Sequence, residues 1–199
     1  MSATEITALL LFCTAMSFSP GPNTTLSTAL AANHGLAHAL RFVCAVPVGW
    51  GVLLALCAAG LGGLVLAVPG LRWGVKVVGV VYLLWLAWKL SGSGTLASAD
   101  SAKLDVSFMQ GAALQFVNIK AWMLALTIVA GWIAGREDAL TRFAIVLPVM
   151  LAFAFASNLA YASMGALLRA WLASGARLLW FNRAMAAVLV ATAAWMGTV

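Results

Sequence analysis

Apolar residues fall into six long runs along the chain, separated by short polar or glycine- and proline-containing stretches. A helix that crosses the bilayer needs about 20 residues, and each run is long enough. The clearly hydrophilic stretch at residues 91–107 follows the third run and predicts a linker between two halves. The pattern predicts spanning helices over residues 6–30, 38–67, 71–90, 108–134, 139–168 and 178–196, with a loop at 169–177.

The first run is interrupted by a Pro-Gly-Pro sequence at residues 20–22, followed by Asn23, Thr24 and Thr25. Prolines remove amide donors, clash with the preceding turn and disfavour helix in the residue before them. In hydrocarbon the freed backbone groups must be buried in protein or line a cavity. A half-helix that restarts after Pro22 would point free amides and a positive dipole end into the membrane, which suits a carboxylate. The alternative is a purely structural proline kink.

Lys120 lies about a dozen residues into the fourth run, beside Asn118. An ionisable side chain at this depth is costly in lipid and by default indicates a functional site. Lys120 could receive a substrate carboxylate or change its protonation during transport. The alternative is that the fourth span is itself broken here, with Lys120 bonded to carbonyl groups at the break; the two interpretations are compatible.

Ser157, Asn158 and Tyr161 form a polar patch in the fifth run. Asn158 and Tyr161 are three residues apart and share one helix face. Hydrogen bonding between helices is the favoured interpretation of this patch. A contribution of Asn158 to a binding site remains open.

The two halves of the chain resemble each other. Arg41-Phe42 is followed by Pro47-Val48, and Arg142-Phe143 is followed by Pro148-Val149 with the same spacing. Each half also begins with a polar interruption in its first span. Three spans per half would insert the halves in opposite orientations, which is the inverted-repeat arrangement of secondary transporters, with the site at the repeat interface. We therefore expect an all-α integral membrane protein of six helices in two inverted three-helix repeats, with broken first and fourth spans.

Composition narrows the class of protein. Of the 199 residues, 64% are hydrophobic and 8% are charged, whereas soluble domains carry roughly 25% charged residues. The chain is long enough for the six spans in one transmembrane domain. We expect this domain to consist of two repeats, residues 1–90 and 108–199, joined by the linker at 91–107. The chain lacks a phosphate-binding loop and a constellation of acid, base and nucleophile, so no enzyme activity or cofactor is expected. The net charge of +6 fits basic residues beside spans better than nucleic-acid binding.

Loops after the first, third and fifth spans carry more lysine and arginine than the loops after the second and fourth. Under the positive-inside rule this favours both termini outside the cytoplasm. The long, glycine-rich second span leaves room for a dimer interface. No acidic residue lies deep in a span and no Cys or His cluster suggests a metal, so an inorganic-ion exporter or channel is the alternative rather than the leading hypothesis.

The chain resembles the LysE/RhtB family of bacterial amino-acid exporters. The resemblance rests on the Phe-Ser-Pro-Gly-Pro-Asn sequence at residues 18–23, the glycine-rich second span, residues 76–86, and the elements at 108–111 and 118–121. It covers nearly the whole chain. The family's fourth span usually has a proline between the asparagine and the lysine, and this chain has Ile119 there. We therefore expect the fourth span to be less sharply broken than in the family.

This resemblance implies efflux of amino acids or related small metabolites across the bacterial cytoplasmic membrane, driven by the proton-motive force. The expected substrate is a small zwitterion. Its carboxylate would be held by the half-helix end after Pro22 and by Lys120, with the asparagines completing the site. The residues expected to bind substrate are Pro20, Gly21, Pro22, Asn23, Thr24, Asn118, Lys120 and Asn158.

Overall fold

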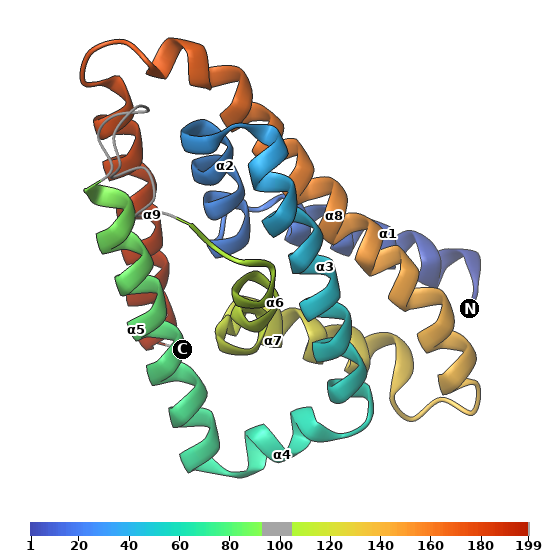
Figure 1. Cartoon of the computed structure of the whole chain (residues 1–199). Helices are drawn as coiled ribbons and strands as arrows, with labels where there is room; N and C mark the ends of the chain where they lie inside the picture. Colours follow the sequence, from blue (N-terminus) through green and yellow to red (C-terminus); the bar gives the residue numbers. More distant parts are fainter. Residues whose placement is uncertain (93–104, 199) are drawn as a thin grey trace.

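The computed structural model describes residues 1–92 and 105–198. In these ranges the chain is helical and contains no strand, as expected for an all-α membrane protein. Most of the predicted linker lies outside the described residues. The helices, labelled in Figure 1, are α1 (Ala3–Phe18), α2 (Pro22–His34), α3 (Leu36–Ala58), α4 (Leu61–Ala67), α5 (Pro69–Ser91), α6 (Phe108–Val117), α7 (Ile119–Ile128), the π-helical turn η2 (Val129–Ile133), α8 (Ala139–Leu172) and α9 (Arg177–Thr198).

Four of these helices, α3, α5, α8 and α9, are individually long and apolar enough to cross a membrane. The pair α1 and α2 and the pair formed by α6 with α7 and η2 each pass the same test when taken together. The described chain thus has four spans, or up to six when each bent pair counts as one span. The predicted breaks in the first and fourth spans are confirmed.

The first break follows from its prolines. Ser19 and Gly21 are both in extended conformations, with φ and ψ of −72° and 141° at Ser19. Pro22 is the first residue of α2, where its missing amide costs nothing and its fixed φ suits a helix start. The axes of α1 and α2 differ by 51°.

The second break is the sharper one. The axes of α6 and of the helix that follows differ by 68°, so the fourth span is clearly bent although Ile119 stands in place of the family's proline; a weaker break than in the family stays a prediction. Asn118 takes the extended conformation that ends α6 and begins α7. Trp122 stabilises the break because its indole Nε1 donates to the carbonyl of Phe116 at 2.8 Å. Gly79 of α5 faces the Val117 carbonyl so closely that a Cβ atom would clash with it.

The second predicted span, residues 38–67, is wrong as a single helix. Helix α3 ends at Ala58, and Gly60, with φ of 100°, starts the separate short helix α4. Left-handed backbone of this kind is readily adopted by glycine and ends helices efficiently. The predicted loop at 169–177 is also too long, because α8 continues to Leu172. Pro47 and Pro148 lie inside α3 and α8, as expected.

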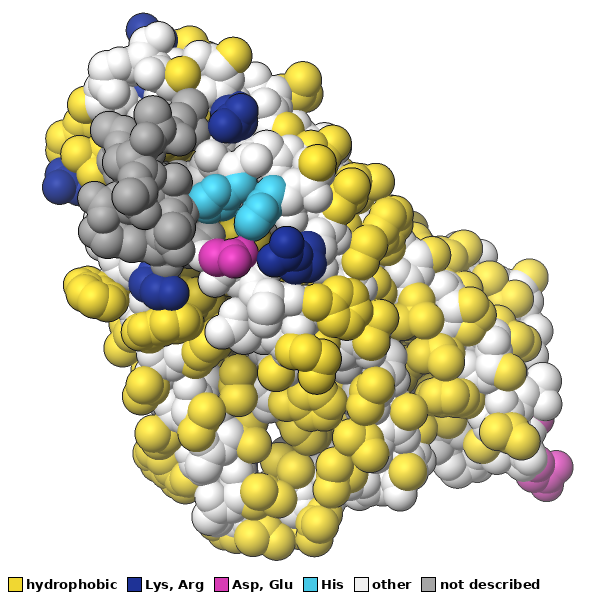
Figure 2. Space-filling model, in the orientation of Figure 1, with side chains coloured by type: hydrophobic (Ala, Val, Ile, Leu, Met, Phe, Trp, Pro, Cys, Tyr) yellow, Lys and Arg dark blue, Asp and Glu magenta, His cyan; other side chains and the backbone are white. Residues whose placement is uncertain are grey.

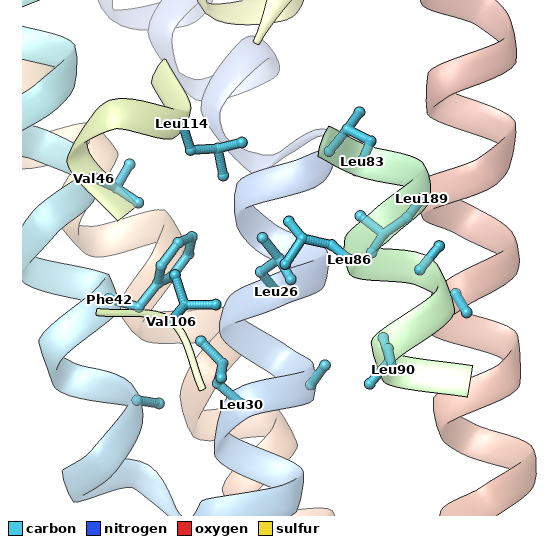
Figure 3. Close-up of a cluster of buried hydrophobic side chains, with 14 of the residues drawn as sticks. Leu26, Leu30, Phe42, Val46, Leu83, Leu86, Leu90, Val106, Leu114 and Leu189 are labelled. Carbon is cyan, nitrogen blue, oxygen red and sulfur yellow. The ribbon is translucent and has the colours of Figure 1, made fainter. Parts of the chain in front are cut away.

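Helix α2 lies inside the bundle, between α3, α8 and α9 (Figure 1). One apolar core surrounds it and includes Leu26, Phe42, Leu86 and Leu189 from four helices (Figure 3). A second core joins α1, α3, α7 and the first part of α8. The outward faces of the long helices carry many exposed apolar side chains (Figure 2), as expected for surfaces that contact lipid.

Candidate functional site

A cavity of about 60 Å³ lies where the two broken spans meet. Its volume could hold a few water molecules or a small polar group. It is lined by residues from both breaks and from α3 and α8: Met16, Ser17, Gly21, Pro22, Asn23, Thr24, Val46, Trp50, Asn118, Lys120, Ala121, Leu124, Met150, Ala154, Ser157 and Asn158.

The end of α1 supplies oxygen atoms to Lys120 across the cavity wall. The Nζ atom of Lys120 donates to the backbone oxygen of Ser19 at 2.9 Å and to its Oγ at 2.8 Å. A longer contact of 3.4 Å joins Nζ to the carbonyl of Pro20. The Tyr161 hydroxyl donates to the carbonyl of Phe18 at 2.9 Å. The carbonyl groups freed by the first break are therefore satisfied by side chains of α7 and α8.

The first residues of α2, Pro22, Asn23 and Thr24, line the same cavity. The first intrahelical bond joins the Thr25 amide to the Gly21 carbonyl at 3.0 Å. The amides of Asn23 and Thr24 precede that bond, in the first turn, where helix amides have no partner within the helix. The Thr24 hydroxyl accepts from the Gly21 amide at 3.0 Å and so fixes the start of α2.

Asn23 is held by Gln115 of α6. Each side-chain amide donates to the oxygen of the other, at 2.9 and 3.1 Å, and Gln115 also donates to the Gly111 carbonyl at 3.1 Å. Gln115 is fully buried. Gln115 is not among the residues expected from the sequence to bind substrate. A glutamine inside an apolar run was the signal that could have identified it.

Asn118 and Asn158 have different environments. Within residues 1–92 and 105–198, the Oδ1 atom of Asn118 has no hydrogen-bond partner, although the residue is only 3% exposed. Asn158 is bonded on both sides: its Oδ1 accepts from Ser27 at 2.8 Å and its Nδ2 donates to the Ala154 carbonyl at 2.8 Å. The interhelical hydrogen bond favoured for Asn158 is therefore present, while Asn118 lines the cavity and carries a buried acceptor that no described residue pairs.

The structure brings together all the expected site residues except one. Pro20 does not line the cavity. It lines a neighbouring apolar groove of about 500 Å³ between the first break and α9, and Lys120 and Gly21 border both spaces. The apolar wall formed by Val46, Trp50 and other residues could not be predicted, because cavity-facing and lipid-facing side chains are of the same type.

A further polar pair lies deeper along α2. Asn33 and Asn182 exchange two side-chain hydrogen bonds, at 2.8 and 2.9 Å, and both are buried. This pair attaches α2 to α9. With the Asn23–Gln115 and Ser27–Asn158 contacts, α2 is joined by polar side chains to three other helices.

Apolar spans, two broken helices and a cavity lined by both breaks are typical of a multi-pass membrane transporter. The family model described as LysE type translocator matches residues 14–198, and the chain belongs to this family. The resemblance stated from the sequence is thus confirmed. The chain is a transporter of the bacterial inner membrane and not an enzyme.

Curated relatives match over most of their length. The chain is 29% identical to a cysteine/O-acetylserine efflux protein of Klebsiella pneumoniae over 191 residues, which are 96% of this chain and 95% of the relative. It is also 29% identical over 152 residues to a cysteine/O-acetylserine efflux protein of Escherichia coli K12, covering 76% of this chain and 77% of the relative. No solved structure matches the chain.

Proposed function

We propose that the chain is a secondary active exporter of amino acids or related small zwitterions. The names of its relatives support amino-acid-type export. The observation that carries the proposal is the cavity itself. Its lining includes the first turn of a half-helix, where amides lack partners within the helix, and Asn118, whose buried Oδ1 has no partner among the described residues. An anion-binding end beside an acceptor matches the two charged groups of a zwitterion.

The substrate carboxylate binds at the start of α2 in this proposal. The amides of Asn23 and Thr24 point from the first turn, where the helix dipole also favours negative charge. Pro22 and Gly21 set the direction of this turn, and Thr24 keeps it closed on Gly21. The ammonium group of the substrate then donates to Oδ1 of Asn118, whose unpaired state is costly until a donor arrives.

Lys120 contributes to substrate binding in this proposal by changing its hydrogen-bond acceptors. Its ammonium is bonded to oxygens of Ser19 and Pro20. A carboxylate is a stronger acceptor for a charged donor than a neutral carbonyl. We infer that an incoming carboxylate competes with the end of α1 for Lys120, so that substrate binding loosens the link between the two broken spans.

The finer architecture is part of the proposal: one transmembrane domain made of two inverted repeats, residues 1–90 and 108–199, joined by the linker at 91–107. Three observations support it. A bent helix pair opens each half. Pro47 and Pro148 lie inside the next helices, each six residues after an arginine. Helices α3 and α8 start at opposite ends of the molecule (Figure 1). A dimer interface on the second span stays a prediction.

The test is efflux from cells loaded with a panel of dipeptides, which release free amino acids inside. Cells that make the protein should lose a subset of amino acids faster than cells without it. Asn23→Ala and Lys120→Ala should abolish the difference. Lys76→Ala is the matched control, because Lys76 lies over the Trp73 ring in α5 and does not line the cavity.

The proposal that the proton-motive force drives transport rests on the family resemblance. The same efflux experiment tests it when an uncoupler is added. An uncoupler should stop the efflux in cells with the parent chain. Efflux that continues in the presence of the uncoupler would contradict coupling to the proton-motive force. Equal loss of every amino acid with and without the protein would remove amino-acid export itself.

A further inference from the structure

Two clusters of charged side chains lie at opposite ends of the described chain. At one end, Arg142 donates to Glu5 at 2.8 Å and to Asp138 at 2.6 Å. At the other end, Asp105 contacts His38 at 3.0 Å and Arg41 at 3.9 Å. Figure 2 shows acidic, basic and histidine side chains grouped beside the start of α3. We call these ends the Glu5 end and the Asp105 end.

The two arginines occupy matching positions in the two halves. Arg41 precedes Pro47 by six residues in α3, and Arg142 precedes Pro148 by six residues in α8. Each arginine pairs with an acid at the start of the other half's broken span. Glu5 lies in the first turn of α1, and Asp105 comes just before α6. If the first and second halves of the chain are interchanged, Arg41 and Asp105 take the places of Arg142 and Glu5. The proposed inverted repeat would relate the two ion pairs in this way.

An apolar layer separates the cavity from the Glu5 end. On α8, Val146 lies one turn after Arg142 and is fully buried, and Met150, one turn further, lines the cavity. On α1, buried Leu9 and Cys13 occupy the corresponding turns, and all of these apolar residues belong to one core. A substrate that leaves the cavity in this direction must part α1 from α8.

A second apolar layer separates the cavity from the Asp105 end. Phe42 follows Arg41 directly on α3 and is fully buried, and Val46, one turn later, lines the cavity. Val106 follows the acid and Leu114 lies further along α6; both belong to the same core as Phe42 (Figure 3). A route in this direction must part α3 from the start of α6.

From this arrangement we infer that Glu5–Arg142 and Asp105–Arg41 are a pair of latches that close the two ends of the cavity in turn during transport. The inference rests on the proposed transport function. Breaking either pair frees the start of a broken span from the helix that it leans on. Glu5, Arg142, Asp105 and Arg41 are thus positioning residues for the transport cycle, outside the cavity itself.

The two latches are unequal in this structure. The side chain of Arg142 is 10% exposed and makes two short contacts, whereas those of Arg41 and Asp105 are each 51% exposed and 3.9 Å apart. Arg142 also holds the pKa of Asp138 below its usual range by hydrogen bonding. Exposed ion pairs contribute little, and shielded ones with good geometry contribute more. The Glu5 end is therefore the more firmly closed of the two.

Side-specific thiol labelling tests the inference without any substrate. A single cysteine placed by Ser157→Cys, in the cavity wall, reports access in a chain whose native cysteines, Cys13, Cys44 and Cys57, are replaced by serine. A membrane-impermeant reagent is applied to right-side-out and inside-out vesicles. Arg142→Gln should raise labelling from the Glu5 end roughly tenfold and leave the other end unchanged. Arg41→Gln is the matched variant, with a smaller rise from the Asp105 end.

Glu5→Gln is a second, milder variant, because it removes the same contact from a more exposed partner. If Glu5 and Arg142 act through their mutual contact, a variant that carries both Glu5→Gln and Arg142→Gln should be labelled no more than Arg142→Gln alone. The latch inference would be contradicted if labelling were unchanged in both Arg142→Gln and Arg41→Gln, or if it rose equally from both ends. A labelling shift without any amino-acid efflux would instead contradict the proposed function and leave the latches standing.

Discussion

Single polar residues inside the spans carry most of the information about the site. Asn23, Asn118 and Lys120 are expensive in hydrocarbon unless they have partners or a role. The structure gives partners to Asn23 and Lys120 and leaves the Oδ1 atom of Asn118 without one. At this scale, residues with hydrogen-bond partners across the site differ from Asn118, for whose Oδ1 atom the described residues supply no partner.

Asn118→Ala should weaken transport more than it weakens the fold. Its Oδ1 has no partner to lose, so the amount of folded protein should stay close to that of the parent. A hydrogen bond to a charged group contributes roughly 1.5–3 kcal/mol, so the half-saturating concentration of substrate should rise by about tenfold or more. Efflux measured over a range of internal concentrations gives this value. An unchanged half-saturating concentration would contradict the role of Asn118.

The type of a residue can be predicted from the sequence more easily than its partner. Asn23 and Lys120 are polar residues in apolar runs, and this marks them as candidates. That Lys120 bonds to the end of α1 depends on how two distant segments meet, and no local pattern encodes this. Trp50 and Met150 line the cavity without any signal, since an apolar side chain serves equally well against substrate, protein or lipid.

At the scale of helices, glycine positions decide how closely the elements approach. Gly165 of α8 faces the Thr28 carbonyl of α2, and Gly49 of α3 faces the Ala112 carbonyl of α6, each too closely for a Cβ atom. Both glycines allow an inner half-helix to pack backbone to backbone against a long one. Small residues serve this purpose widely at helix contacts in membranes.

Gly165→Ala should separate α2 from α8 and destabilise the protein by roughly 1–3 kcal/mol, the usual cost of overpacking. Thermal unfolding in detergent would measure the loss. Gly63→Ala is the matched control, because nothing lies within 4 Å of a Cβ atom there. If Gly165→Ala and Gly63→Ala were equally stable, the close contact between α2 and α8 would not contribute to the free energy of unfolding.

Ile119→Pro should be tolerated, although it introduces a proline into a span. Ile119 is the first residue of α7, where proline is favoured. Asn118 already has φ of −93° and ψ of 100°, which suits a residue before proline. Efflux should stay within about twofold of the parent. Ala125→Pro, in the middle of α7, is the control and should abolish folded protein. Loss of folded protein with Ile119→Pro would contradict this view of the break.

At the scale of the whole molecule, the cavity lies between two apolar cores, and each end of the bundle carries its own ion pair. The sequence predicted the helical class and the two breaks, and both are present; the inverted repeat stays a proposal. The sequence did not indicate the end of α3 at Ala58, because the apolar pattern continues past Gly60 and only the backbone turn there ends the helix.

Orientation in the membrane is testable at this scale. The basic residues favour both termini outside the cytoplasm, which places the Asp105 end inside. A reporter enzyme that is active only outside the cytoplasm should be active when joined after the last residue. The same reporter inserted in the turn between α8 and α9 should be inactive. The reverse pattern would invert the direction assigned to each latch.

The hydrogen bonds around α2 have a consequence for how the protein is made. Asn23, Ser27 and Asn33 find their partners on α6, α8 and α9, all of which are synthesised later. A nascent chain that has completed only its first half holds these groups in the bilayer with their native partners still missing. Stalled or truncated chains would therefore display unsatisfied polar groups to membrane proteases, and the finished chain would conceal them.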